Sequence, residues 1–444
     1  MRVDGWRRGL KGLPRLISSV LPCLLPLCLA GAAGAAAAPG ADATPPTTPT
    51  NARALPPALA DSPCATGALV DPVFRDAALQ ALAGLAVKAP GRSAHGAVRS
   101  HHSAGYVDGQ GRAWHQISAY QVNLGLVGAL RMGPQQLPLA ADWLGWLARH
   151  IAPGGASRGV VLDHWVRAGD FEESTCPPGM APELCGAVDA FDSTAATTLL
   201  LADAYLAHGG DVMLVRSPAL RQALEASATT LNALATAEGL TLAKPSHPVA
   251  YTMDVVEVIA GWRAWARVQR DAYAQPQSAI NSFALASRAE AGLRSRLWLE
   301  PAGAWRVSLG SAAPQRSRWY PDTVAQAWPL LWGVDAGPPG RARDAWRQAI
   351  APWQPPAPTH WARKTADPDG FWWPAVAVAA LCTGDEASAR TWVARARARW
   401  LDPKSPFAWP FQVGDLLWLL WLAEPAGAAP QASATSVATV PPRH

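Results

Sequence analysis

Two kinds of helical stretch alternate along most of the chain. The first kind carries apolar residues on one face and charged residues on the other, as a helix does when one side covers a core and the other meets water. The second kind is apolar nearly all round, which is typical of helices buried on every side. The first kind covers residues 72–88, 138–150, 218–236, 281–298, 341–350 and 385–400, and the second covers 117–131, 192–207, 254–268, 322–333, 371–383 and 412–423.

The alternation repeats six times between residues 67 and 424, and this repeat predicts the architecture. Six inner helices ringed by six outer ones form an (α/α)6 toroid, an all-α six-hairpin barrel. Two separate helical bundles are the alternative, but no linker-like segment divides residues 67–424. The alternation of side chains that is typical of strands is weak throughout. We therefore expect one all-α domain over residues 67–424.

The lengths of the connecting segments indicate which end of the toroid is functional. Connections from an inner to an outer stretch are short, whereas those from an outer to an inner stretch include the long segments 89–116, 151–191, 299–321 and 351–370. Long loops in a compact domain usually serve a function. Because these loops lead into the first residues of the inner helices, we expect the functional site at that end.

The flanking segments differ in composition from the helical region. Residues 1–38 have a basic start, an apolar run and a stretch of small residues, which is the pattern of a secretory signal peptide, with an uncleaved anchor as the alternative. Residues 39–66 form a Pro-, Ala- and Thr-rich linker, and 425–444 resemble them and are expected to be a disordered tail. We therefore expect a periplasmic or extracellular protein.

Charge argues against two classes of partner. The chain of 444 residues has a formal net charge of +5, and most of this positive charge lies in residues 1–38. The rest is nearly neutral, so attraction to nucleic acid or to an anionic membrane is not expected. No glycine-rich nucleotide-binding motif and no GxSxG nucleophile motif is present in the sequence.

Cysteines indicate an oxidising compartment. Cys176 and Cys185 flank a proline-rich segment, and in an exported protein they are expected to form a disulfide. Their spacing is not CxxC and no histidine lies at a ligand spacing from them, so a zinc site there is not expected. We expect no cofactor and no metal.

Five carboxylates lie at or just before the starts of inner stretches. Asp189 and Asp192 precede and begin the second, Asp254 and Glu257 lie in the third, and Asp322 begins the fourth. Capping of helix N-termini is the alternative role for Asp192, Asp254 and Asp322. Glu257 stands out because it lies among Val and Ile residues, where an unpaired charge is costly to bury. Asp254 and Glu257, three residues apart, share one helix face.

Aromatic and polar residues accompany these carboxylates in the same connecting segments. Sugar rings stack their C–H faces on flat aromatic side chains, while a cation such as Arg318 recognises an acidic sugar. One ring of the pair Trp372 and Trp373 is expected to lie in the core instead. The candidate substrate-binding residues are His115, Gln121, His247, Tyr251, Arg318, Trp319, Tyr320, Trp372, Trp373 and Trp409.

The pattern resembles the six-hairpin glycosidase superfamily, and glycoside hydrolase family 8 more distantly. The segment 189–196, with the sequence DAFDSTAA, runs into the apolar residues 199–202, as at the acidic entry to an inner helix in such families. The segment 118–121, with the sequence SAYQ, falls where family 8 enzymes carry the glutamate that acts as the acid. Ala119 replaces that glutamate here, so the resemblance implies that the acid comes from another helix or that glycans are bound without cleavage.

Three hypotheses follow. In a glycoside hydrolase acting on a poly- or oligosaccharide, Glu257 or Asp254 would donate the proton and Asp189 or Asp192 would be the base, with Asp322 in reserve. In a polysaccharide lyase, Tyr320 or Tyr251 would abstract a proton with help from His247, and Arg318 would neutralise a uronate. A non-catalytic glycan-binding protein of exopolysaccharide handling is the third. The sugar, the linkage and the oligomeric state stay open.

Overall fold

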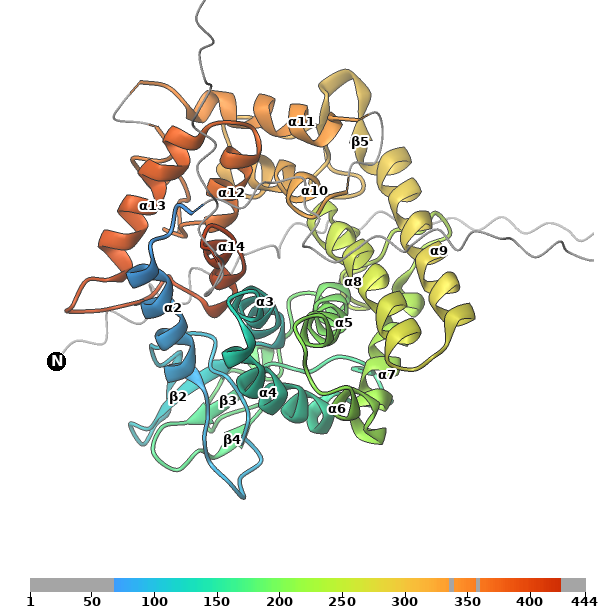
Figure 1. Cartoon of the computed structure of the whole chain (residues 1–444), viewed down its shortest axis with the longest axis vertical. Coiled ribbons are helices and arrows are strands. Elements are labelled where there is room, and N and C mark those ends of the chain that lie inside the picture. The colour runs from blue at the N-terminus through green and yellow to red at the C-terminus, as the bar shows by residue number, and fades with distance from the viewer. Residues whose placement is uncertain (1–67, 335–338, 357–359, 425–444) are drawn as a thin grey trace, which may run out of the picture. The chain divides into compact units, whose positions relative to one another are not determined.

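The computed structural model describes residues 68–334, 339–356 and 360–424, and its helices form the predicted toroid. Figure 1 shows an outer ring of helices around an inner ring. The outer helices are α2 (Pro72–Leu85), α4 (Leu137–His150), α7 (Pro218–Leu234), α9 (Pro276–Gly292), α11 (Arg341–Ile350) and α13 (Glu386–Trp400). The inner ones are α3 (Ala119–Leu130), α5 (Phe191–Ala207), α8 (Thr252–Asp271), α10 (Trp328–Leu331), α12 (Pro374–Cys382) and α14 (Leu416–Trp421). The all-α fold class is confirmed, while the signal, linker and tail expected at 1–38, 39–66 and 425–444 lie outside the described residues.

The ring closes between the two ends of the described region. The backbone N–H groups of Leu69 and Val70 both donate to the carbonyl of Leu422, at 3.0 Å. Nearby, Arg397 of α13 contacts Asp71 at 2.8 Å, and the same aspartate caps α2 by accepting from the Phe74 N–H. The cap therefore begins the first outer helix and also joins it to the last one.

Inner helices approach one another closely where small residues meet. A side-chain carbon added at Gly128 of α3 would lie 2.6 Å from the Leu417 Cα of α14. A carbon at Gly261 of α8 would likewise lie 2.8 Å from the Ala196 Cα of α5. Glycine is therefore required at these crossings, because any larger residue would push two backbones apart.

The fourth inner element departs from the predicted helix over 322–333. It comprises a π-helical turn at Trp319–Thr323 (η8), a 3-10 turn at Val324–Gln326 (η9) and the short α10. Pro321 and Pro329 both lie in this stretch, and each lacks the backbone N–H that a continuous helix requires. The apolar pattern correctly indicates burial here, but prolines break the helix into pieces.

Strands absent from the sequence prediction lie in the long loops. β1 (Tyr106–Val107), β2 (Ala113–Ile117), β3 (His164–Arg167) and β4 (Glu173–Ser174) form one antiparallel sheet in that order, and β5 (Trp298–Leu299) pairs with β6 (Ala304–Trp305). These strands are so short that the alternation of apolar and polar side chains along them cannot be distinguished from the sequence of a loop. β2 leads directly into α3, which places the four-stranded sheet at the entry to the inner helices.

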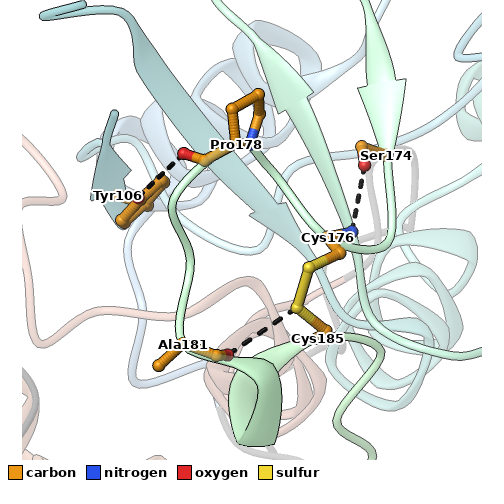
Figure 2. Close-up of a disulfide and its surroundings, with 6 residues drawn as sticks. All are labelled: Tyr106, Ser174, Cys176, Pro178, Ala181 and Cys185. Atoms are coloured by element: carbon orange, nitrogen blue, oxygen red, sulfur yellow. Dashed lines mark hydrogen bonds between the residues drawn. A yellow bond between two sulfur atoms is a disulfide. The ribbon is translucent and has the colours of Figure 1, made fainter. Parts of the chain in front are cut away.

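The loop that follows β4 is closed by a disulfide. The structure pairs Cys176 with Cys185, as Figure 2 shows. The Cys176 N–H donates to the Ser174 hydroxyl at 3.0 Å, and the Tyr106 hydroxyl donates to the Pro178 carbonyl at 3.0 Å. The disulfide loop is thereby attached both to β4 and to β1.

Helices in the described part of the chain lack the combination of length and hydrophobicity that crossing a bilayer requires.

Candidate active site

Glu257 of α8 is the point where three inner helices meet. Its side chain is buried, with 2% of the residue exposed. One carboxylate oxygen accepts hydrogen bonds from the Tyr120 hydroxyl of α3 at 2.8 Å and from the Trp328 indole N–H of α10 at 3.0 Å. Burial raises the pKa of Glu257, and these two donors act in the opposite direction. The apolar surroundings that single out Glu257 in the sequence are therefore compensated by donors from two neighbouring helices.

Asp192 lies fully buried in the first turn of α5. It accepts hydrogen bonds from the Ser193 N–H and from the Thr241 hydroxyl, each at 2.8 Å. Burial raises its pKa to about 7, and the nearby charge of Glu257 contributes to the rise. Asp192 is not the N-cap of α5, because Ala190 occupies that position.

Asp254 is half-buried in the first turn of α8, and it is surrounded by other carboxylates. Burial is the main cause that raises its pKa well above the usual value, and the charges of Asp192, Glu257 and Asp189 raise it further. The pKa of Asp254 is therefore shifted in the direction that favours the protonated acid. Asp189 belongs to the loop before α5, and its side chain is exposed to solvent. The alternative capping role does not apply to Asp254 either, since Tyr251 is the N-cap of α8.

Two aromatic rings stack on each other near these carboxylates. Tyr320 and Trp373 stack with ring centroids 5.0 Å apart and planes 20° from parallel. The Trp373 indole N–H donates to Asp367 at 2.7 Å, which fixes the orientation of the ring. Burial, followed by the charges of Asp189 and Asp254, raises the pKa of Tyr320, so the platform lies within electrostatic reach of both acids.

The backbone of Trp373 adopts an unusual conformation in this platform. Its φ angle is +50°, in the left-handed region that a bulky aromatic residue rarely occupies. Such a conformation costs of the order of 1–3 kcal/mol and persists where the surroundings impose it, often at functional sites. Trp372 next to it packs against Trp392 and Trp400 of α13, and both rings of the pair are partly buried against the core.

A further carboxylate, Asp163, is not among the residues expected from the sequence. It is half-buried at the end of the loop after α4 and accepts a hydrogen bond from the Gln116 amide at 2.7 Å. Burial raises its pKa to about 7, the charge of Asp189 adds to this, and the charge of Lys244 opposes it. The available signal was the apolar run of residues 160–162 that ends in a carboxylate.

Asp322 and Arg318 do not join the carboxylate cluster. They form an ion pair with each other at 3.4 Å, and Asp322 also accepts from the Gln315 N–H at 2.8 Å. Asp322 lines a small pocket that includes Gln348 of the outer helix α11. Neither capping nor reserve catalysis fits this position, because Arg318 is the N-cap residue and the acid points toward the outer ring. Trp319 is also buried, against Trp353.

Tyr251, His247 and Trp409, which were also expected at the site, have different surroundings. Tyr251 shares a hydrogen bond of 2.8 Å with His247, and the charges of Asp254 and Asp189 add to burial in raising the pKa of Tyr251. Trp409 is 38% exposed and contacts His101 edge-on.

His115 and Gln121 have structural surroundings. His115 is buried in β2, and its neighbour Gln116 is the residue that reaches Asp163, because adjacent strand residues point to opposite faces. Gln121 packs against Gly414, where an added side-chain carbon would meet the amide oxygen at 2.1 Å. Because the sequence does not predict strand β2, it indicates His115 as a candidate substrate-binding residue and not its neighbour Gln116.

Comparison with known proteins supports the fold. No family model matches the chain, and no curated protein matches it. Among solved structures, one titled "Glycosidase Wild Type" is similar at 14% identity and a TM-score of 0.50, covering 79% of this chain and 96% of that one. A glycosidase variant in complex with glucose is similar at 13% identity and a TM-score of 0.51, with the same coverage. At these identities the likeness establishes a shared fold, and the chemistry must be argued from the residues themselves.

Proposed function

We propose that this protein is a glycoside hydrolase in which Asp254 is the proton donor and Asp189 is the base or nucleophile. The observation that carries the proposal is a half-buried carboxyl group, whose pKa is raised by burial and by neighbouring carboxylates, together with a solvent-exposed carboxylate at the same end of the toroid. Glycoside hydrolysis needs one acid to protonate the leaving oxygen and one carboxylate to activate water or to attack the sugar.

The deeper carboxylates have a supporting role in this proposal. Glu257 and Asp192 are buried more fully than Asp254, and their charges help to raise the pKa of Asp254. Tyr120 and Trp328 hold Glu257 in place. Such an arrangement matches the general rule that an active-site acid has its pKa raised by burial and by like charges nearby.

A sugar ring fits the aromatic surface next to the two acids. The platform formed by Tyr320 and Trp373 offers a flat apolar face, and Asp367 fixes its orientation. Because carbohydrate rings present C–H faces to such surfaces, the substrate class proposed is a poly- or oligosaccharide. The names of the two similar solved structures agree with this class.

The more distant resemblance to glycoside hydrolase family 8 lies in the acidic segment 189–196 that leads into α5, and it does not extend to the glutamate that acts as the acid in that family. Ala119 is the first residue of α3 and is 2% exposed, so no carboxylate is available at the place where family 8 carries its glutamate. We propose that α8 supplies the acid in its place, through Asp254. A glycan-binding protein without turnover is the competing explanation for Ala119.

A lyase is less well supported. Its proposed bases, Tyr251 and Tyr320, both have a raised pKa, which makes a tyrosine a poorer proton acceptor near neutral pH. Arg318, the cation proposed to neutralise a uronate, is paired with Asp322. We further propose export to the periplasm or the exterior, an assignment supported by the signal-like sequence and by the disulfide between Cys176 and Cys185.

A panel of neutral and uronic-acid polysaccharides tests the proposal. Release of reducing ends without ultraviolet absorbance, lost in Asp254→Asn and Asp189→Asn and kept in Asp142→Asn, identifies the hydrolase and its two acids. Asp142 is a matched control because it is exposed on the outer helix α4. Absorbance from a new C=C bond would identify a lyase, and binding without turnover across the panel would contradict the proposal of an enzyme.

A further inference from the structure

Two histidines and a glutamate converge outside the carboxylate cluster. His150 ends α4, His164 begins β3 and Glu173 begins β4, and all three side chains are half-buried. One ring nitrogen of each histidine and one carboxylate oxygen lie within 4.8 Å of one another. No metal site is expected from the sequence, because these three residues come from separate elements and form no spacing motif.

Hydrogen bonds to the backbone set the protonation of both imidazole rings. His150 Nδ1 lies 2.8 Å from the Trp146 carbonyl, and His164 Nδ1 lies 2.7 Å from the Leu162 carbonyl. A carbonyl oxygen only accepts, so each Nδ1 carries a hydrogen and each neutral ring keeps its lone pair on Nε2. Histidines that bind metal ions are oriented in this same way by a backbone carbonyl on the other nitrogen.

Glu173 is oriented as well, and one of its oxygens faces an imidazole of the trio. Its Oε1 accepts from the Trp146 indole N–H at 3.0 Å, whereas Oε2 lies 3.2 Å from His150 Nε2. Bonds of about 2.0–2.1 Å in a tetrahedral zinc site place two ligand atoms about 3.3 Å apart. The measured separation of this pair therefore already fits a shared metal ion.

Trp146 holds the three residues together from one side. It is fully buried, stacks on the His150 ring at 4.1 Å and meets the His164 ring edge-on at 5.4 Å. The residue contacts every member of the trio, counting its hydrogen bond to Glu173. An apolar side chain of this kind excludes water around a metal site and fixes the ligands.

An ion pair between protonated His150 and Glu173 is the simpler alternative, because their contact meets the geometry of one. That alternative explains two of the three residues. It gives no reason for the approach of His164, a second imidazole that would lie beside a cation and whose own Nδ1 is fixed by a carbonyl.

We propose that His150, His164 and Glu173 bind a divalent transition-metal ion of the zinc class, with water completing a tetrahedral site. Two histidines, one glutamate and a water are a recurrent ligand set for zinc. The ion would join the end of α4 to β3 and β4. It would thereby brace the segment between α4 and α5, which carries Asp163 and Asp189, without contacting the carboxylates proposed for catalysis.

Zinc binding to the full chain, purified without a polyhistidine tag and stripped with a chelator, tests this proposal. We expect one equivalent of ZnCl2 to bind by calorimetry and the melting temperature to rise by about 4 °C at a hundredfold excess over Kd. Co²⁺ should give the intense visible absorption of a tetrahedral site. These readouts need no substrate, so they are independent of whether the protein is a hydrolase.

Two variants and one control complete the experiment. Glu173→Gln keeps an acceptor for the Trp146 indole but removes the anionic ligand, and His164→Gln removes one imidazole; both should lose the zinc-dependent rise in melting temperature. His208→Ala, at an exposed histidine after α5, should keep it. Equal zinc binding by the wild type and both variants, or no binding by the wild type, would overturn the proposal, and the ion pair would then stand.

Discussion

We expect Asp192 to lower the stability of the protein as the pH rises. The residue is fully buried, and its pKa is raised from 3.8 to about 7. An aspartate with a raised pKa in the folded state binds its proton more tightly there than in the unfolded chain. Below pH 3.8 both states are protonated and no penalty exists. Above that value the unfolded state ionises first, so stability falls with rising pH until the folded pKa is passed.

The size of the penalty follows from the separation of the two pKa values. They lie about three pH units apart, and each unit corresponds to ~1.4 kcal/mol, so the full cost of ionising Asp192 is ~4 kcal/mol above pH 7. Asp192→Asn removes this cost while keeping an oxygen that can accept from the Ser193 N–H or the Thr241 hydroxyl. Any stability that the variant loses because of the new amide is independent of pH, so it cancels when the free energies of unfolding at two pH values are compared.

Urea denaturation of the wild type and Asp192→Asn at pH 4 and pH 8 measures the effect. We expect the free energy of unfolding of the variant, relative to the wild type, to increase by ~4 kcal/mol between pH 4 and pH 8. Asp142→Asn, at an exposed position, should show no such change. A difference between Asp192→Asn and the wild type that is the same at both pH values would refute the reasoning, because Asp192 would then be ionised without cost.

Three further predictions concern the inner helices. Glu257→Gln removes a charge that raises the pKa of Asp254, so the alkaline limb of the kcat/KM profile should move to lower pH; an unchanged limb would contradict the supporting role of Glu257. Asp203→Ala removes the buried carboxylate that lies 2.8 Å from Arg267 and should lower the free energy of unfolding by about 3–5 kcal/mol; a loss below 1 kcal/mol would show the pair to be dispensable. Gly128→Ala should cost about 1–3 kcal/mol in the same assay through its clash with α14, whereas Gly145→Ala, with only Arg149 at 3.8 Å, should be neutral or stabilising; equal effects would contradict the close packing of α3 on α14.

Hydrophobic patterning was sufficient to predict the ring of helices but not the loops. The outer helix α13 and the inner helix α5 differ so strongly in their polar faces that their layers can be assigned from the sequence. The strands β2 and β3 are each held by pairing with a segment distant in the chain, which a local pattern does not contain. The prolines at 321 and 329 were visible, but their effect on the fourth inner helix depends on packing.

The sequence indicated where a buried carboxyl group would need partners, but not in which direction side chains point. Glu257 could be singled out because a carboxyl group among valines needs partners, and the structure provides them. Asp322 has the same position at the start of an inner element, yet the broken helix turns it toward α11. Asp163 escaped notice because its partner Gln116 is presented by a strand. A side chain's direction depends on local backbone geometry, which composition and spacing do not specify.

The activity of Asp254→Asn on two substrates that differ in their leaving group tests the proposed mechanism most directly. A natural glycoside needs protonation of its leaving oxygen, whereas a glycosyl fluoride of the same sugar does not. We expect kcat on the glycoside to fall by about 10²–10⁴-fold, with kcat on the fluoride nearly unchanged. Equal losses on both substrates, or full activity on the glycoside, would contradict the assignment of Asp254 as the proton donor.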